Sequence, residues 1–365
     1  MTTSNAARNN IVDVARQSNP VDTTSPYDAG WVAGKTILIT GGASGFGEGF
    51  FRKWAENGAN VIIGDVNGAR GKALVEEVRK STGNQNHHYL HCDVTNWQSQ
   101  VDFFRTAAEL SPSKGIDSVV ANAGITDQVM SFQRPLDLDA PGPPKPNFKA
   151  FEVDLLGVLY TAHLALWYLP RNPQSQKASP STTPGPNTPD RHLLLIGSLA
   201  SFTAFPGQVL YAVSKHGVLG LFRSLRPTSF VNGVRVNMLC PYFIDTPLIP
   251  TAGRLILAGG AMGKPEDVVD AGTRLMADTR IVGRALVIGP KVRVDGEFDL
   301  LPETSNGGNQ KAVWEAYADD LNEIDVFGAR FVRLVNTLET IRGWRGWAFD
   351  VLTALVYPIR SMFGR

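Results

Sequence analysis

A tyrosine, a lysine and a serine stand at spacings that suit proton and hydride transfer. Tyr211 and Lys215 close the stretch Tyr-Ala-Val-Ser-Lys, and Ser198 precedes Tyr211 by thirteen residues. Residues four apart share one helix face, so the Lys215 ammonium would lower the pKa of the phenol from about 10. Tyr211 would then take or give a proton as hydride moves. Ser198 would hydrogen-bond the substrate oxygen and stabilise its developing charge.

Each of these residues also has a purely structural interpretation. Ser198 could cap a loop, Tyr211 could be an aromatic at a helix start, and Lys215 could be solvated. His216 points about 100° away from Lys215 on a helix, so we interpret it as structural.

A glycine-rich turn, Thr40-Gly-Gly-Ala-Ser-Gly-Phe-Gly47, lies far upstream of these residues. It follows the apolar strand 35–40 and precedes a helix over 46–57, which is the context that a dinucleotide site requires. Glycines let the backbone approach a pyrophosphate, and the helix N-terminus favours its negative charge. The alternative is an ordinary glycine-rich connection.

Asp65 ends a second apolar strand, eighteen residues past Gly47. A carboxylate there accepts hydrogen bonds from the adenosine ribose hydroxyls and repels a 2′-phosphate. Neither the glycine turn nor Val66-Asn67 supplies a cation, so the sequence favours NAD over NADP. The alternative is a solvated carboxylate at a strand end.

Composition restricts the class of protein. The chain has 365 residues, 43% of them hydrophobic and 19% charged, and a net charge of +1. It can bury one large α/β core, and a nucleic-acid partner is not expected. The N-terminus lacks the pattern of a signal peptide, and Cys92 and Cys240 are expected to be free thiols. We therefore expect a cytoplasmic protein.

Strands and helices alternate along the chain, which predicts one doubly wound parallel sheet, a Rossmann fold, covered on both faces. Asp65, Asp93, Asn122, Ser198 and Pro241 fall at the carboxyl ends of its strands, where such sheets bind ligands. The expected strands are 36–40, 60–64, 89–92, 118–121, 191–197, 234–239 and 284–288, and the expected helices are 45–57, 69–80, 97–109, 151–168 and 211–226.

Over about residues 30–290 these motifs resemble the short-chain dehydrogenase/reductase family. The resemblance implies catalytic roles for Ser198, Tyr211 and Lys215, with Lys215 also holding the cofactor ribose. It implies pairing of subunits through the helices at 151 and 211 into a homodimer or homotetramer. The cofactor-binding residues that it implies, beside Asp65, are Gly41, Ser44, Gly45, Phe46, Gly47, Asp93, Val94, Asn122, Ala123, Gly124, Tyr211, Lys215, Pro241 and Thr246.

Two residues depart from the family pattern. Asp154 stands where the family usually has an Asn that holds a water in a helix kink and links the Lys to solvent. An Asp accepts hydrogen bonds but lacks the amide donors, so we include Asp154 among the catalytic residues with an altered role. Tyr242 replaces a Gly and would crowd the nicotinamide end.

The stretch His87-His-Tyr-Leu-His-Cys92 raises the question of a metal site. It is expected to be a strand, on which His91 and Cys92 point to opposite faces, and no second ligand cluster accompanies it. We therefore expect no metal.

The segment after Pro241 is rich in apolar residues and resembles the family's variable substrate lid. It favours a small lipophilic substrate, although the same residues could pack on the core. Phe202 and Phe205 could add a wall. The lid residues are Tyr242, Phe243, Leu248, Ile249, Leu255, Ile256 and Leu257.

The additions to the core define the expected domain organisation. Residues 1–30 are a polar extension, 31–300 the dehydrogenase domain, and 301–365 a helical tail. The Pro- and Ser-rich stretch 171–190 is expected to be a mobile insertion, and the proline-rich stretch 128–146 an irregular loop. The tail has helical apolar spacing from Phe331 to Ile341 with arginine flanks. It packs on protein or, alternatively, makes peripheral membrane contact.

The sequence therefore predicts an NAD-linked dehydrogenase or ketoreductase that acts on a lipophilic secondary alcohol or its ketone. The family resemblance is closest to relatives that oxidise hydroxylated fatty-acid, prostaglandin or polyketide-type alcohols, with a likeness to fungal secondary metabolism. One alternative is a membrane-associated dinucleotide-binding regulator without turnover. Another is a redox-neutral biosynthetic enzyme of the same fold.

Overall fold

The computed structural model describes residues 16–127, 132, 139, 141–143, 145–173, 175–203, 205–246, 262–295, 299–302, 310–316 and 331–341, with only the backbone for 293–295, 299–302 and 310. The chain forms two compact units, Gln17–Ala318 and a second made of Met1–Arg16 with Asp319–Arg365. In the second unit, residues 331–341 form a helix, as their apolar spacing predicts.

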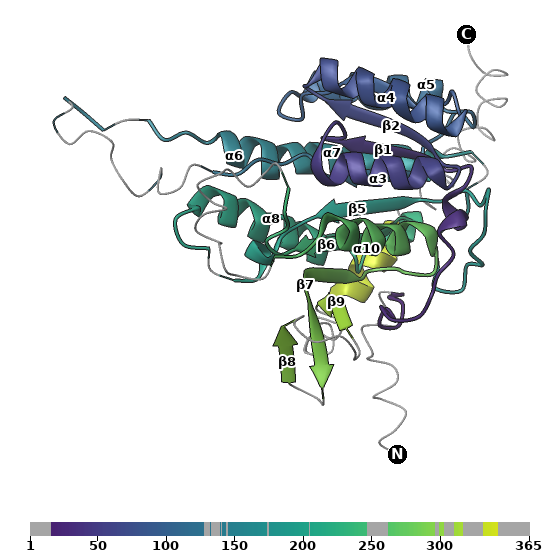
Figure 1. Ribbon diagram of the computed structural model, residues 1–365. Coiled ribbons are helices and arrows are strands. Elements are labelled where there is room, and N and C mark those ends of the chain that lie inside the picture. The colour runs from purple at the N-terminus through teal and green to yellow at the C-terminus, as the bar shows by residue number, and fades with distance from the viewer. Residues whose placement is uncertain are drawn as a thin grey trace, which may run out of the picture. The chain divides into compact units, whose positions relative to one another are not determined.

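The larger unit is built on one sheet, shown in Figure 1. Within the described residues nine strands take the order β3-β2-β1-β4-β5-β6-β7-β8, with β9 also on β7. The pairs from β3 to β7 are parallel. The strands are β1 Thr36–Thr40, β2 Asn60–Asp65, β3 His88–His91, β4 Ser118–Ala121, β5 His192–Ile196, β6 Arg235–Pro241, β7 Ala285–Asp295, β8 Asp299–Pro302 and β9 Gln310–Ala316.

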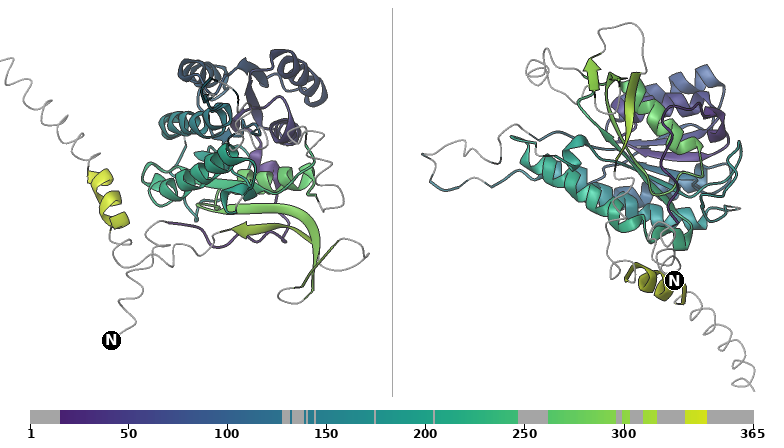
Figure 2. Two further views of the ribbon diagram at one scale, coloured as in Figure 1. Left: turned by 90° about the vertical axis from the view of Figure 1, so that its left-hand side faces the viewer. Right: turned by 90° about the horizontal axis from the view of Figure 1, so that it is seen from below.

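Helices cover both faces of this sheet (Figure 2). One core cluster unites residues of α3, α4 and α10, and the other unites residues of α5, α7 and α8. The helices are α3 Gly45–Glu56, α4 Gly68–Thr82, α5 Trp97–Leu110, α6 Lys149–Phe151, the π-helix η2 Glu152–Gly157, α7 Val158–Tyr168, α8 Val209–Leu225 and α10 Pro265–Ala277, with 3-10 turns η1 Ala29–Val32, η3 Leu169–Arg171, η4 Leu199–Ser201 and η5 Ser229–Asn232.

The strand sequences explain why the sheet is covered twice. Successive side chains of a strand point to opposite faces. In β1, Ile37 and Ile39 join one core cluster while Leu38 joins the other. Every residue of β1 is buried. An uninterrupted apolar run of this kind is typical of a parallel strand with helices on both faces. The predicted doubly wound fold is therefore confirmed.

The sheet differs from the prediction at its last edge. The expected final strand, 284–288, continues as β7 to Asp295, and β8 and β9 pair with β7 in the antiparallel direction. A chain that returns through a short connection can pair only in this way, because a parallel partner needs a long crossover. The sheet thus extends past residue 300, where the helical tail was expected to begin.

Helix α10 was not among the predicted elements, although its sequence carries signals. Pro265 occupies the first turn, where its missing N–H costs nothing, and Glu266 and Asp267 complement the helix dipole. Val268, Ala271 and Leu275 are fully buried against the sheet at helical spacing. The prolines and glycines of the preceding segment obscured this periodicity.

Two loop segments are held on the larger unit by hydrogen bonds. In the N-terminal segment, Ser18 N–H donates to Val282 O and Val21 N–H to the Glu315 carboxylate. In the stretch 171–190, Asn172 and Asp190 are buried, and Ala178 N–H donates to Gly233 O. The ends of this stretch and Ala178 are thus held in place, and the mobility of the remaining residues stays a prediction.

A buried ion cluster lies at the amino ends of β1, β5 and β6. The Asp190 carboxylate accepts from Lys35 Nζ at 2.9 Å and from Arg235 at 2.7 Å. Burial alone would raise the pKa of Asp190, but Arg235 and Lys35 outweigh it and hold the pKa below its ordinary value. The cluster links β1 to β5 and β6, across β4, at the end of the sheet opposite to Asp65 and Ser198.

One helical segment, Lys149–Arg171, is apolar and long enough to cross a membrane by composition alone, with a mean hydropathy of 1.2. Half of its apolar window is buried, and α7 packs against α5, β4 and β5. It is the central helix of one sheet face, and core helices commonly pass such a test. Among the described residues it is the one helix with this length and composition.

Candidate active site

The glycine turn connects β1 to α3 with a conformation that its sequence requires. Gly41 has φ +65°, and a Cβ there would lie 2.7 Å from Ala123 Cα. Gly47 is buried under the turn, and a Cβ on it would lie 2.3 Å from Gly41 O. Both positions therefore need glycine, because a side chain would push α3 away from the strand ends. The N-terminus of α3 is left open at Ser44 and Gly45, which are exposed.

A cavity of about 470 Å³ opens at the carboxyl ends of the strands. Eleven of the predicted cofactor-binding residues line it: Gly41, Ser44, Gly45, Phe46, Asp65, Asp93, Val94, Asn122, Ala123, Gly124 and Thr246. Five further residues line the cavity for which the sequence predicted no cofactor-binding role, namely Val66, Cys92, Ile125, Lys149 and Val153. Among the described residues that line the cavity, the predicted Gly47, Tyr211, Lys215 and Pro241 do not appear.

Asn122 joins the glycine turn to the next strand. Its side-chain amide donates to Thr40 O at 2.9 Å and to Gly41 O at 3.0 Å. These bonds hold the end of β4 against the start of the glycine turn.

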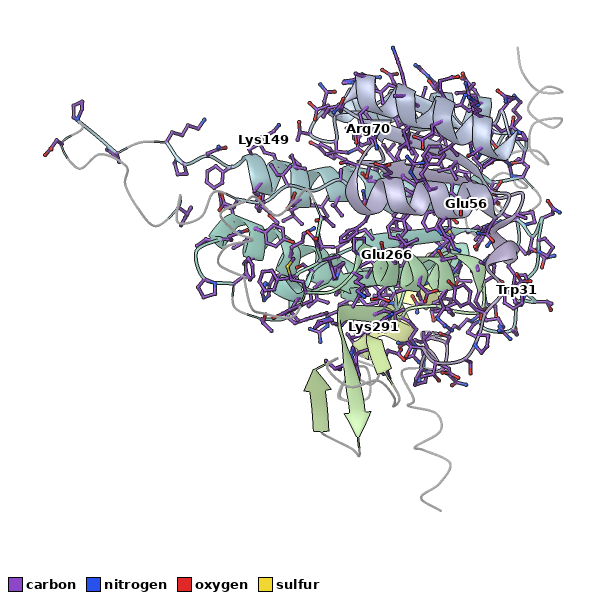
Figure 3. All side chains as sticks on the ribbon, in the orientation of Figure 1. Trp31, Glu56, Arg70, Lys149, Glu266 and Lys291 are labelled. Carbon is purple, nitrogen blue, oxygen red and sulfur yellow. The ribbon has the colours of Figure 1, made fainter. Side chains whose placement is uncertain are left out.

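Asp65, the last residue of β2, lines the cavity. One carboxylate oxygen accepts from Ala43 N–H at 3.0 Å and the other from Asn67 N–H at 2.9 Å. The nearby Arg70 places one guanidinium nitrogen 2.7 Å from both oxygens of Glu48. Among the described lining residues Lys149 supplies the only cation. It begins α6, as Figure 3 shows. Hydrogen bonds from Thr95 lower the pKa of Asp93, and the positive charge of Lys149 lowers it further.

Ser198, Tyr211 and Lys215 come together where β5 ends and α8 begins. The Ser198 hydroxyl accepts from Ala200 N–H at 3.2 Å, capping η4, and donates to Pro241 O at 3.5 Å. Helix α8 packs against η4. Lys215 Nζ donates to Ile196 O at 3.2 Å and lies 5.6 Å from the centroid of the Tyr211 ring. The predicted catalytic side chains thus share one corner of the sheet.

Asp154 lies within the π-helix η2, so the main chain is irregular at the expected kink. Its side chain is fully buried and accepts from Ile125 N–H at 2.8 Å through Oδ1. No residue of the described chain donates to Oδ2. A Cβ on Gly124 would lie 3.5 Å from Asp154 Oδ1 and 3.8 Å from Lys215 Nζ, so both groups border the same small space. Burial raises the pKa of Asp154 to about 6, and Lys215 opposes this rise.

The histidine-rich strand has a structural explanation. His87 is buried, and its Nδ1 accepts from Val61 N–H at 3.2 Å, while burial lowers its pKa to about 4. His91 is exposed and Cys92 is buried, so the two face opposite sides as expected. Across the described part of the chain, no three His, Cys, Asp or Glu residues gather as metal ligands.

Part of the predicted substrate lid lies outside the described residues, namely Leu248, Ile249, Leu255, Ile256 and Leu257. Tyr242 and Phe243 are described, directly after β6, and a short bridge pairs Ile244 with Gly263. Thr246 is buried at the edge of the cavity. Most of the stretch 128–146 is likewise outside the description.

Comparisons with known proteins agree with this geometry. A family model described as Enoyl-(Acyl carrier protein) reductase matches residues 41–287. The chain is 36% identical over 296 residues to a 5'-hydroxyaverantin dehydrogenase of Dothistroma septosporum, covering 77% of this chain and 91% of that one. It is 32% identical over 287 residues to the NADP-dependent dehydrogenase M3 of a Phoma species, covering 75% and 80%.

Among solved structures, the fold matches a 3-ketoacyl-(acyl-carrier-protein) reductase from Brucella melitensis complexed with NADH. The TM-score is 0.56 at 23% identity, covering 71% of this chain and 98% of that one. With the glycine turn, the cavity and the Ser198–Tyr211–Lys215 corner in place, these matches show that the chain belongs to the short-chain dehydrogenase/reductase family of oxidoreductases.

Proposed function

We propose that the protein transfers hydride between NAD(H) and a lipophilic secondary alcohol or its ketone, with Tyr211 as general acid and base. The observation that carries this proposal is the corner formed by Ser198, Tyr211 and Lys215 beside a cavity of about 470 Å³. The family membership supports the same class of reaction.

The residues of the cavity fit a dinucleotide. The open N-terminus of α3 offers free N–H groups to a pyrophosphate, and the glycine turn lets the cofactor approach. Asp65 offers a carboxylate to the ribose, and Asn122 to Gly124 border the route to Tyr211. When bound, NAD supplies a ring carbon that accepts hydride from the alcohol carbon.

In oxidation, the alcohol would lose its hydroxyl proton to the Tyr211 phenolate and its carbinol hydride to bound NAD, which would leave a ketone. The Lys215 ammonium, which lies 5.6 Å from the centroid of the Tyr211 ring, stabilises the phenolate. Ser198 donates a hydrogen bond to the substrate oxygen in place of its long bond to Pro241 O. Reduction runs through the same contacts in reverse.

Asp154 is proposed to act on this chemistry through Lys215. It can carry a proton near pH 6 and change the charge beside the lysine, whereas an asparagine would only order a water. This makes Asp154 a positioning residue for the proton path rather than a group that touches the substrate.

Several features support NAD over NADP. The Asp65 carboxylate would repel a 2′-phosphate, and Arg70 is already bound by Glu48. Relatives named as NADP-dependent exist, including the Phoma enzyme. We therefore base the proposed preference of this chain for NAD on Asp65 and not on its relatives.

We propose the substrate class from the apolar residues after Pro241, and the type of metabolism from the names of the relatives. The 5'-hydroxyaverantin dehydrogenases act, by name, on a hydroxylated compound. A lipophilic alcohol of fungal secondary metabolism fits both observations. We also propose that the chain forms a homo-oligomer in the cytoplasm and binds no nucleic acid.

The test follows the absorbance of reduced nicotinamide across a panel of lipophilic secondary alcohols and ketones with NAD or NADP. We expect turnover with NAD, and loss of at least about a hundredfold in kcat for Tyr211→Phe, because the proton has no acceptor. Tyr160→Phe, which removes a hydroxyl on α7, is the matched control and should leave kcat unchanged. Full activity of Tyr211→Phe would refute the assigned role.

A further inference from the structure

Three aromatic residues continue outward from the Tyr211 ring. The Phe205 centroid lies 6.0 Å from that of Tyr211, Phe243 lies 5.5 Å from Phe205, and Tyr242 lies 4.8 Å from Phe243. Phe205 precedes α8, and Tyr242 and Phe243 directly follow β6. We call Phe205, Tyr242 and Phe243 the aromatic wall.

The aromatic wall is not part of the hydrophobic core. None of its three residues belongs to either core cluster or to the partly buried residues packed against one, among the described residues. Phe205 and Phe243 are half-buried, and Tyr242 is 37% exposed. Core packing therefore does not explain why three rings gather here.

The aromatic wall lies beside both groups that would hold the reacting oxygen. Phe205 contacts the Tyr211 ring, and Pro241, next to Tyr242 in the chain, accepts the hydrogen bond from Ser198. A substrate whose oxygen meets Tyr211 and Ser198 would thus have its adjoining carbon skeleton near these rings. The Phe205 and Phe243 rings are tilted by 36° and the Phe243 and Tyr242 rings by 82°, so the rings of the wall are not parallel.

We propose that the aromatic wall binds an aromatic ring of the substrate, so that the enzyme selects aryl-bearing secondary alcohols over saturated ones of similar size. This inference rests on the proposed function, because it places the reacting carbon at Tyr211. Apolar area alone would not separate the two substrates, whereas ring quadrupoles favour an aromatic partner in tilted or offset contact.

The test compares 4-phenyl-2-butanol with 4-cyclohexyl-2-butanol as substrates with NAD. Two methylene groups separate each ring from the carbinol carbon, so both alcohols lose hydride and proton with the same intrinsic ease. We expect kcat/KM to favour the phenyl compound by about threefold to tenfold, the range that aromatic pair energies imply.

The variants Phe205→Leu and Phe243→Leu keep an apolar side chain but remove the ring. Each should move the ratio of the two kcat/KM values toward one, while Phe230→Leu, in η5 before β6, should keep the wild-type ratio. Equal kcat/KM values in the wild type would overturn the inference, as would a preference that survives in both wall variants.

Failure of the proposed function would look different. If neither alcohol is oxidised, the hydride-transfer proposal fails for these compounds, and calorimetric titration of both alcohols into the NAD-saturated protein then decides the inference alone. Tighter binding of the phenyl compound, lost in the wall variants, supports the aromatic wall. Equal affinity overturns it.

Discussion

The carboxyl group of Asp154 is fully buried, and its Oδ2 accepts no hydrogen bond from the described residues. Burial raises its pKa, the Lys215 ammonium opposes this rise, and a second carboxylate, Asp127, adds to it. Near neutral pH this site therefore holds an ionised carboxylate, which lowers the free energy of unfolding. Substitution of Asp154 should change both the stability and the pH dependence of activity.

Asp154→Asn should stabilise the protein above pH 6. The pKa of Asp154 is raised from 3.8 to about 6 on folding, so its favourable contribution is complete below about pH 4 and lost as the pH rises through 6. At pH 8 we expect a gain of about 2–3 kcal/mol in the free energy of unfolding, and little change at pH 4. Urea unfolding at both pH values measures it, and an equal effect at the two would show that charge is not the cause.

The same substitution should shift the pH profile of activity. Loss of the negative charge near Lys215 strengthens the positive potential at Tyr211, so the acidic limb of kcat/KM for oxidation should move down by about one pH unit. Asp102→Asn, an exposed carboxylate on α5, is the control. An unchanged pH profile would mean that the charge of Asp154 has no electrostatic effect on the Tyr211 phenol.

Asp65 should decide the choice of cofactor. In Asp65→Asn the amide oxygen can keep one backbone bond, but the charge that repels a 2′-phosphate is gone. We expect the ratio of the NADP Kd to the NAD Kd to fall about tenfold or more, because hydrogen bonds to a charged group contribute about 1.5–3 kcal/mol. Fluorescence titration with both cofactors measures it. Tighter binding of NADP than of NAD by the wild type would contradict the assignment.

At the scale of elements, the ion cluster of Lys35, Asp190 and Arg235 fixes the amino ends of β1, β5 and β6. Removing one partner of a buried ion pair leaves an uncompensated charge, at a cost of about 3–5 kcal/mol. Asp190→Asn should lower the free energy of unfolding by this amount at pH 7. The exposed pair of Arg105 with Asp102 gives the control Asp102→Asn, with an expected loss of at most about 1 kcal/mol.

The pH dependence of this cluster has the opposite sign to that of Asp154. The folded pKa of Asp190 is depressed, so its stabilisation is present above the ordinary pKa of an aspartate and is lost as the pH falls. The difference between wild type and Asp190→Asn should therefore shrink in acid. A difference that stays constant as the pH falls from about 4 to about 2.5 would argue against an ionic cause.

Elements with strong periodicity could be predicted from the sequence alone. The apolar run Thr36–Thr40 and the helix over 97–109 match β1 and α5 within a residue. β9 could not be foreseen, because it is specified by its pairing with β7 and by little in its own residues. Motif spacing found Ser198, Tyr211 and Lys215, whereas Lys149 and Val153 line the cavity only through the packing of η2 and α6, which no local pattern shows.

At the scale of the whole molecule, Gln17–Ala318 contains the nine described strands, the cavity and the corner formed by Ser198, Tyr211 and Lys215. A chain ending at Ala318 should therefore keep its affinity for NAD and a single unfolding transition. Sedimentation with phosphatidylserine vesicles, full-length against truncated, tests the membrane alternative for the arginine-flanked tail. Loss of NAD affinity on truncation would show that the tail completes the site.

The central claim is that hydride passes from substrate carbon to NAD at the Tyr211 corner. The most direct measurement uses an alcohol from the activity panel with deuterium at its carbinol carbon, followed by mass spectrometry of the nicotinamide product. The account predicts that reduced cofactor formed by the wild type carries the deuterium, and that Tyr211→Phe forms almost none. Conversion of the alcohol with the NAD unchanged, or reduced cofactor without deuterium, would contradict it.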